Sequence, residues 1–108
     1  MRVSQAISCF FDYHKINSKQ NTMRNYENLL TRFSNQFSER ELESIKTDEI
    51  LAFLTHSSQG VRQTTKRLRY SLLSAFFNFI RSSVNPTLQN PCETPILTKL
   101  FKVVRPTP

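Results

Sequence analysis

Residues 62–83 read RQTTKRLRYSLLSAFFNFIRSS, and this stretch decides the fold. Its apolar residues recur at spacings of three and four, the period of a helix with one buried face. The apolar arc is wide, as expected of a helix that packs against several others. It comprises Leu68, Leu72, Ala75, Phe76, Phe79 and Ile80, widened by Leu73 and Phe77. The sequence Asn85-Pro86 predicts the end of this helix.

Upstream of this stretch, the same periodicity predicts three shorter helices, over residues 4–16, 22–37 and 48–57. The second has the clearest amphipathic pattern, formed by Tyr26, Leu29, Leu30, Phe33 and Phe37. A β-rich fold is disfavoured, because tight hairpin turns favour glycine and the chain has only Gly60. We therefore predict an all-α fold, a small four-helix bundle with a proline-containing C-terminal extension.

Polar residues mark where these helices are expected to begin and end. Asn21 or Thr22 suits the N-cap of the second helix, and Thr47 suits that of the third. The sequence Ser38-Glu39-Arg40-Glu41 has the pattern of a capping box, which predicts one short turn between them. Gly60 is the candidate C-terminal cap of the third helix.

All five prolines of the chain lie between residues 86 and 108. This composition divides the chain into a helical domain, residues 1–84, and a C-terminal extension or linker, residues 85–108. Thr94 and Pro95 predict the start of one short helix in the linker. The residues expected to dock that helix are Ile96, Leu97, Leu100 and Phe101.

The net charge of +7 is confined to the second half of the chain. Residues 1–59 carry seven basic and seven acidic residues, whereas residues 60–108 carry eight basic residues and Glu93 alone. Clustered positive charge favours a polyanionic partner, because phosphates neutralised by Lys and Arg release their counterions. A basic surface that only keeps the protein in solution is the plain alternative.

Basic residues crowd the first two turns of the helix over residues 62–83. Arg62, Lys66 and Arg69 lie beside the apolar stripe or along its extension, whereas Arg67 points away from it. We expect this end to project beyond the bundle and to fit a DNA major groove, which is about 12 Å wide. Hydroxyl groups for phosphate or base contacts are supplied by Thr64, Thr65 and Tyr70. Alternatively, the long basic side chains only cover apolar neighbours.

The start and outer face of the helix over residues 22–37 carry a second polar cluster. It consists of Arg24, Asn25, Asn28 and Arg32. Asn and Arg are the usual readers of adenine and guanine edges. Any solvated helix face has a similar composition, so this cluster by itself is a weak indication.

The sequence predicts neither a catalytic site nor a metal or cofactor site. Five of the eight acidic residues fall within residues 39–49, at positions expected to cap helices or form a turn. His14 and His56 have no Cys or carboxylate at metal-ligand spacing. The chain also has no Gly-rich phosphate loop and no Gly-x-Ser-x-Gly elbow.

The cysteines and the hydropathy indicate a cytoplasmic protein without a membrane partner. Cys9 and Cys92 are too few and too far apart for a disulfide framework, so we interpret them as free thiols in a reducing cytoplasm. No apolar run is long enough to span a bilayer. The N-terminus has no apolar stretch typical of a signal peptide.

The order of these features resembles the N-terminal SAM-like, or core-binding, domain of tyrosine recombinases, the phage integrase family. The resemblance covers about residues 3–91 and ends on a Phe-Phe-x-Phe motif followed by Asn-Pro. The matching residues are Asn21-Thr22, Tyr26, Leu29, Leu30, Phe33, Phe37, Leu42, Ile45, Thr47-Asp48-Glu49-Ile50, Phe53-Leu54, Thr65, Leu68, Leu72-Leu73, Phe76-Phe77-Asn78-Phe79-Ile80 and Asn90-Pro91.

The resemblance implies a helical bundle that forms one half of a clamp around duplex DNA, with its second and fourth helices against the major groove. Carried over to this chain, it implies DNA contacts by Arg24, Asn25, Asn28, Arg62, Thr65, Lys66 and Arg69. The basic and hydroxyl residues found by periodicity fall on the same two helices.

The catalytic half of that family needs an Arg, a Lys, a His-x-x-Arg motif and a nucleophilic Tyr. Neither His14 nor His56 is followed by Arg three residues later. The resemblance therefore implies a non-catalytic part of a longer recombinase, which would cut and rejoin DNA through a phosphotyrosyl intermediate. Its implied partners are duplex DNA, the catalytic domain of the same parent chain and a recombinase tetramer on DNA.

We therefore predict the DNA-binding, core-site clamp domain of a site-specific tyrosine recombinase or integrase, acting in DNA integration and recombination. The alternative is a helical protein–protein interaction module whose basic face meets an acidic partner. An RNA-binding module is less favoured, because single-strand readers present aromatic platforms and the Phe residues here are needed for the core.

Overall fold

The computed structural model describes residues 1–17, 20–57, 60–95 and 97 of the chain. The elements in chain order are α1 (Val3–Asn17), α2 (Gln20–Phe37), the single 3-10 turn η1 (Leu42–Ser44), α3 (Thr47–Ser57) and α4 (Gln63–Ser83). Within these ranges no residue belongs to a β-strand; Arg2 and Glu41 form only an isolated bridge. The predicted all-α fold and four-helix bundle are confirmed, and each predicted helix boundary lies within two residues of the observed one.

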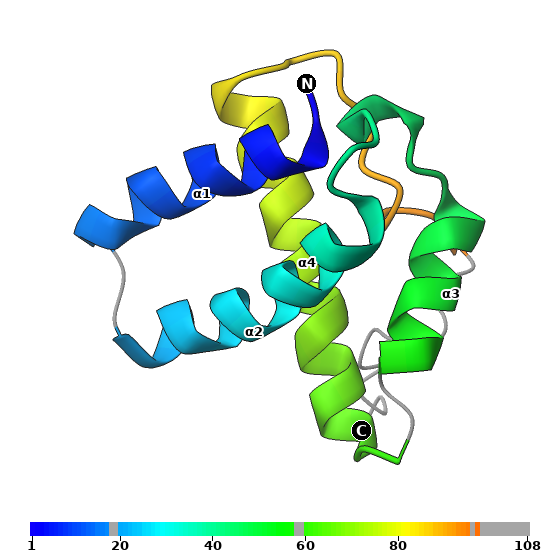
Figure 1. Cartoon of the computed structure of the whole chain (residues 1–108). Helices are drawn as coiled ribbons and strands as arrows, with labels where there is room; N and C mark the ends of the chain where they lie inside the picture. The colour runs from blue at the N-terminus through cyan, green and yellow to red at the C-terminus, as the bar shows by residue number, and fades with distance from the viewer. Residues whose placement is uncertain (18–19, 58–59, 96, 98–108) are drawn as a thin grey trace, which may run out of the picture.

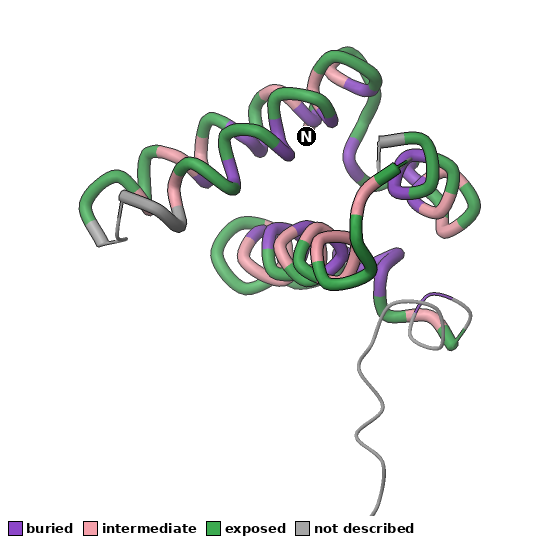
Figure 2. The backbone as a smooth tube through the Cα atoms, turned by 90° about the horizontal axis from the view of Figure 1, so that it is seen from below, coloured by how far each residue is buried: buried purple, intermediate pink, exposed green. Residues whose placement is uncertain are grey.

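Helix α4 forms the centre of the arrangement. The antiparallel pair α1 and α2 crosses it on one side, and α3 lies against it beside that pair (Figure 1). Viewed nearly along α4, the buried segments of the other helices turn toward it (Figure 2). All three neighbours therefore bury apolar residues against the same helix.

Aromatic rings fill the space where these helices meet. The Phe76 ring of α4 packs edge-on against Phe10 of α1 and Phe33 of α2, with centroids 5.5 Å and 6.4 Å apart. Phe33 also meets Phe53 of α3 edge-on, at 5.2 Å. Such pairs add about 0.5–1.5 kcal/mol each beyond the area that they bury. One cluster of rings thus joins all four helices.

The buried stripe of α4 differs from the predicted one. Its buried residues are Tyr70, Leu73, Phe76, Phe77 and Ile80. Leu68, predicted to be in the core, is 44% exposed, and Leu72 and Phe79 are only partly buried. The predicted buried face was rotated about the helix axis relative to the observed one. The apolar residues of α4 occupy a wide arc, and the packing of neighbouring helices determines which part of that arc is buried.

The predicted helix caps are partly wrong. Helix α2 begins at Gln20, so Asn21 and Thr22 lie inside its first turn. Thr47 is the first residue of α3, and its hydroxyl donates to the Pro91 carbonyl oxygen at 3.1 Å. The Lys46 N–H donates to Glu49 Oε1 at 3.3 Å, which is the return half of a capping box. The difference at Thr47 arises because the segment after α4 supplies a nearby acceptor at the start of α3.

The predictions for the turn after α2, for Gly60 and for the end of α4 have different outcomes. Ser38 and Glu39 form a turn, but η1 follows Glu41 without a side-chain cap, so the predicted capping box is not formed there. Gly60 has a positive φ of 75°, a left-handed conformation that favours glycine. Residues 58–59, which would join Gly60 to α3, lie outside the described residues. Helix α4 ends at Ser83, with Val84 as its C-cap residue before Asn85-Pro86, as predicted.

The segment after α4 folds back onto the bundle. Buried Asn90 donates through Nδ2 to the Ser74 carbonyl oxygen and to Asn78 Oδ1, both at 3.1 Å, and its Oδ1 accepts from the Cys92 N–H at 2.8 Å. The Tyr70 hydroxyl donates to the Cys92 carbonyl oxygen at 2.6 Å. These bonds fasten residues 90–92 to the side of α4.

Of the predicted C-terminal helix, Pro95 and Leu97 have helical backbone and Leu97 is buried. Ile96, Leu100 and Phe101 lie outside the described residues. The division of the chain at residue 84 therefore remains a prediction.

Replacing Asn90 by Ala should lower the free energy of unfolding by about 1–3 kcal/mol, because it leaves buried backbone groups without their partner. Chemical denaturation monitored by circular dichroism measures this change. The matched control is Gln89→Ala at the exposed neighbouring position, which should be nearly neutral. Equal stability of the two variants would show that the Asn90 network does not hold the segment.

The two thiols should differ in reactivity. Burial, with the charge of Glu93 as a second cause, raises the pKa of the Cys92 thiol to about 12, whereas Cys9 is only half-buried. Because the thiolate is the reactive form, at pH 8 a disulfide reagent should modify Cys9 in the native protein and Cys92 only after unfolding. A Cys9→Ser variant should lose the fast reaction. Rapid modification of Cys92 in that variant would contradict the expectation.

Candidate nucleic-acid interface

The first two turns of α4 carry basic groups along the continuation of its buried face. At about 100° per residue, Arg62, Lys66 and Arg69 fall on the same arc as the core residues Leu73, Phe77 and Ile80. These turns extend past α2, so the bundle does not cover them as it covers the second half of the helix (Figure 1). Arg62 and Thr64 are exposed, and Thr65, Lys66 and Arg69 are half-buried.

A groove with a volume of about 250 Å³ separates α2 from this part of α4. Asn25 and Asn28 line it from α2, and Thr65 and Arg69 line it from α4. Its remaining lining residues are Leu29, Arg32, Leu68 and Leu72. The fold thus brings four of the seven predicted contact residues together, with amide, hydroxyl and guanidinium groups around leucine side chains.

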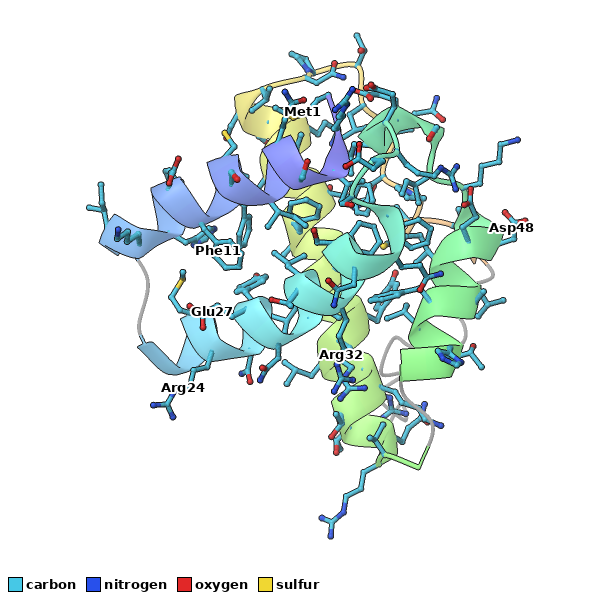
Figure 3. All side chains as sticks on the ribbon, viewed as in Figure 1. Met1, Phe11, Arg24, Glu27, Arg32 and Asp48 are labelled. Atoms are coloured by element: carbon cyan, nitrogen blue, oxygen red, sulfur yellow. The ribbon has the colours of Figure 1, made fainter. Side chains whose placement is uncertain are left out.

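The other three predicted residues, Arg24, Arg62 and Lys66, do not line the groove. Arg24 is exposed one turn before Asn28 and points away from α4 (Figure 3). Arg62 is the N-cap residue of α4 and makes no side-chain cap hydrogen bond. Lys66 lies one turn further along the same helix. These three residues flank the groove.

Arg32 lines the groove but is absent from the seven predicted contacts. It extends from α2 at the level of the first half of α4 (Figure 3). Helical spacing could have found it, because Asn25, Asn28 and Arg32 follow one another at intervals of three and four residues. The sequence analysis placed Arg32 in the polar cluster of this helix, but the resemblance did not carry it over as a DNA contact.

Two guanidinium groups act on each other in this groove. Partial burial lowers the pKa of Arg69, and the nearby positive charge of Arg32 lowers it further. Burial disfavours charge of either sign, whereas the effect of Arg32 shows that two positive charges lie close together in the groove. Their combined positive charge would attract an anion.

The acidic residues predicted to cap helices gather at the other end of α4. Glu41 and Glu43 form ion pairs with the Met1 amino group, with N···O distances of 2.7 Å and 3.4 Å. Glu49 pairs with Arg40. Asn85, just after α4, donates to Glu43 Oε1 at 3.1 Å, which fixes this cluster near the end of α4 and not its start. Positive and negative charge are thus separated along the helix.

Two residues of the 62–83 stretch lie elsewhere than predicted. Arg67, predicted to point away from the core, is half-buried, and its Nε atom is buried without a hydrogen-bond partner among the described residues. Tyr70, suggested as a hydroxyl donor to DNA, is buried and bonds to Cys92. The shifted buried stripe of α4 accounts for Tyr70, which lies on that stripe, whereas Arg67 lies outside its arc.

No metal or membrane feature is found in the part of the chain that the structure describes. No three His, Cys, Asp or Glu side chains there are grouped to hold a metal ion. None of its helices is long and apolar enough to cross a bilayer.

Comparison with known families identifies the domain type. A family model described as the phage integrase N-terminal SAM-like domain matches residues 7–83, which include all four helices apart from the start of α1. The chain belongs to this family. Searches among curated proteins and among solved structures found no match.

Membership assigns this phage integrase SAM-like domain a role in DNA recombination by an integrase or recombinase. The matched region is the N-terminal, non-catalytic part of tyrosine recombinases, and DNA is the general partner of the family. The predicted resemblance is therefore confirmed, both in the family and in the all-helical fold that it implied. The seven contact residues remain predictions.

Proposed function

We propose that this domain binds duplex DNA as one half of the clamp that a tyrosine recombinase closes around its core site. The observation that carries the proposal is the groove between α2 and α4. It gathers Asn25, Asn28, Thr65 and Arg69 beside the cationic start of α4. Contact residues predicted from two separate helices thus lie on one surface.

In this proposal the first turns of α4 enter the major groove, whose width of about 12 Å admits a helix. Arg62, Lys66 and Arg24 contact backbone phosphates on either side, because long cationic side chains at the rim reach them without burial. Asn25 and Asn28 face the base edges, where an Asn amide can bind adenine in a bidentate manner. Thr65 supplies a hydroxyl to either kind of group.

The rest of the recombinase is proposed from the family. Residues 85–108 would lead from the helical domain, residues 1–84, toward the catalytic domain of the same parent chain. That domain would supply the nucleophilic tyrosine, and the assembly on DNA would be a tetramer. The hydrogen bonds between residues 90–92 and α4 support a linker whose first part is held against the bundle.

Reversing the charge of Lys66 and Arg69 (Lys66→Glu/Arg69→Glu) should weaken duplex binding at least tenfold without unfolding the domain. The slope of log affinity against log salt should also fall by about 0.9 for each phosphate that the variant no longer neutralises. Fluorescence anisotropy of a labelled duplex over a salt series measures both quantities, and circular dichroism checks the fold.

The matched control is Lys15→Glu/Lys46→Glu, which changes net charge equally at two exposed positions outside the groove. If both double variants weaken binding equally, binding follows total charge and the assignment to α4 is wrong. Heparin at matched salt tests the alternative protein-interaction module. That alternative predicts no preference for duplex DNA over heparin.

A further inference from the structure

We propose that Arg32 of α2 and Arg69 of α4 together bind one phosphodiester group of the DNA backbone within the groove between these helices. The inference rests on the proposed function and deepens it by assigning a phosphate subsite. Arg32 is not among the seven contact residues that the sequence predicted.

The two side chains reach the same space from different helices. Both line the groove, and they are near enough for the charge of Arg32 to act on Arg69. Arg32 lies at the level of the first half of α4 (Figure 3). The groove volume of about 250 Å³ compares with about 30 Å³ for one water in the liquid. It therefore has room for a tetrahedral anion together with some water.

The chemistry of the lining selects an anion. Each guanidinium presents a planar fork of donors that matches two phosphate oxygens. None of the described residues that line the groove is acidic, and Asn28 and Thr65 add an amide and a hydroxyl donor. The two guanidinium groups repel each other, because the charge of Arg32 acts on Arg69. An anion shared between them would offset that repulsion and also accept hydrogen bonds from both groups.

A backbone phosphodiester is favoured over a free anion because of what surrounds the subsite. Arg62 and Thr64 are exposed on the adjoining turns of α4, and Arg24 is exposed on α2. A continuous polyanion can reach these groups at the same time as the groove, whereas a single free anion cannot. One phosphate held from both helices would fix how α2 and α4 lie on the duplex, because backbone contacts set register.

The test begins with Arg32→Ala, Arg69→Ala and the double variant, with Lys15→Ala on α1 as the matched control. The probe is a duplex enriched from a random-sequence pool by the wild-type chain. Each single variant should bind it about tenfold more weakly, and the double variant should lose little more, because both residues serve one phosphate. The double variant should lower the salt slope by about 0.9, not by twice that value.

Neutral methylphosphonate linkages, placed one at a time in the same duplex, locate the phosphate. One position should weaken wild-type binding and leave Arg32→Ala and Arg69→Ala unaffected. Arg32→Lys should keep the salt slope but still bind more weakly, since an ammonium lacks the fork. Thermal unfolding checks that each variant is folded.

Three results would overturn the subsite. In the first, Arg32→Ala keeps the wild-type affinity and salt slope while Lys66→Glu/Arg69→Glu binds more weakly. DNA binding by α4 would then be supported, but not a phosphate subsite shared by Arg32 and Arg69. In the second, the losses of the two single variants add fully in the double variant. In the third, inorganic phosphate raises the melting temperature of wild type but not of Arg32→Ala, and no methylphosphonate position matters; the groove is then a free-anion site. Absence of duplex binding by the wild-type chain would instead refute the proposed function itself.

Discussion

The structure depends on the burial of aromatic side chains along the second half of α4. Phe76 and Phe77 lie in the same cluster as Phe10 and Phe33, so α1 and α2 both pack on this one segment. Helix α3 joins the same cluster through Phe53. A helix can bury only as much length as its neighbours cover, and here the neighbours gather around residues 70–80. The first two turns of α4 are left for solvent or a partner, and they carry the basic residues.

Basic residues lie at the start of α4, and acidic residues of the α2–α3 connection lie near its end. The acidic connection between α2 and α3 pairs with Met1 and Arg40 near the end of α4, where Asn85 also bonds to Glu43. These surface pairs contribute little stability individually. Their consequence is spatial, because they keep the carboxylates away from the start of the helix. Of the basic residues of the second half, four lie at the start of α4, where the groove opens: Arg62, Lys66, Arg67 and Arg69.

The groove combines apolar and polar surface. Leu29, Leu68 and Leu72 form the apolar part of its lining, and Leu68 is exposed because it lies at the groove and not in the core. Around them lie amide, hydroxyl and guanidinium donors, the groups that bind phosphates and base edges. This composition agrees with the role in DNA recombination that the phage integrase SAM-like family carries. A catalytic activity in this domain is not needed for that role, since the family places the chemistry in another domain.

The sequence by itself determined the number and type of helices, the family, and the confinement of positive charge to the second half. The helices and the charge distribution follow from local periodicity and composition, and the family follows from the resemblance, none of which depends on how the helices pack. The sequence could not determine which part of the wide apolar arc of α4 is covered. Tertiary packing therefore decided that Tyr70 is buried and Arg67 half-buried, that Leu68 lines a groove, and that Arg32 and Arg69 line that groove together. Tertiary packing also decided the partner of Thr47. Its hydroxyl donates to the Pro91 carbonyl oxygen, which belongs to a segment distant in the chain and not to its own helix.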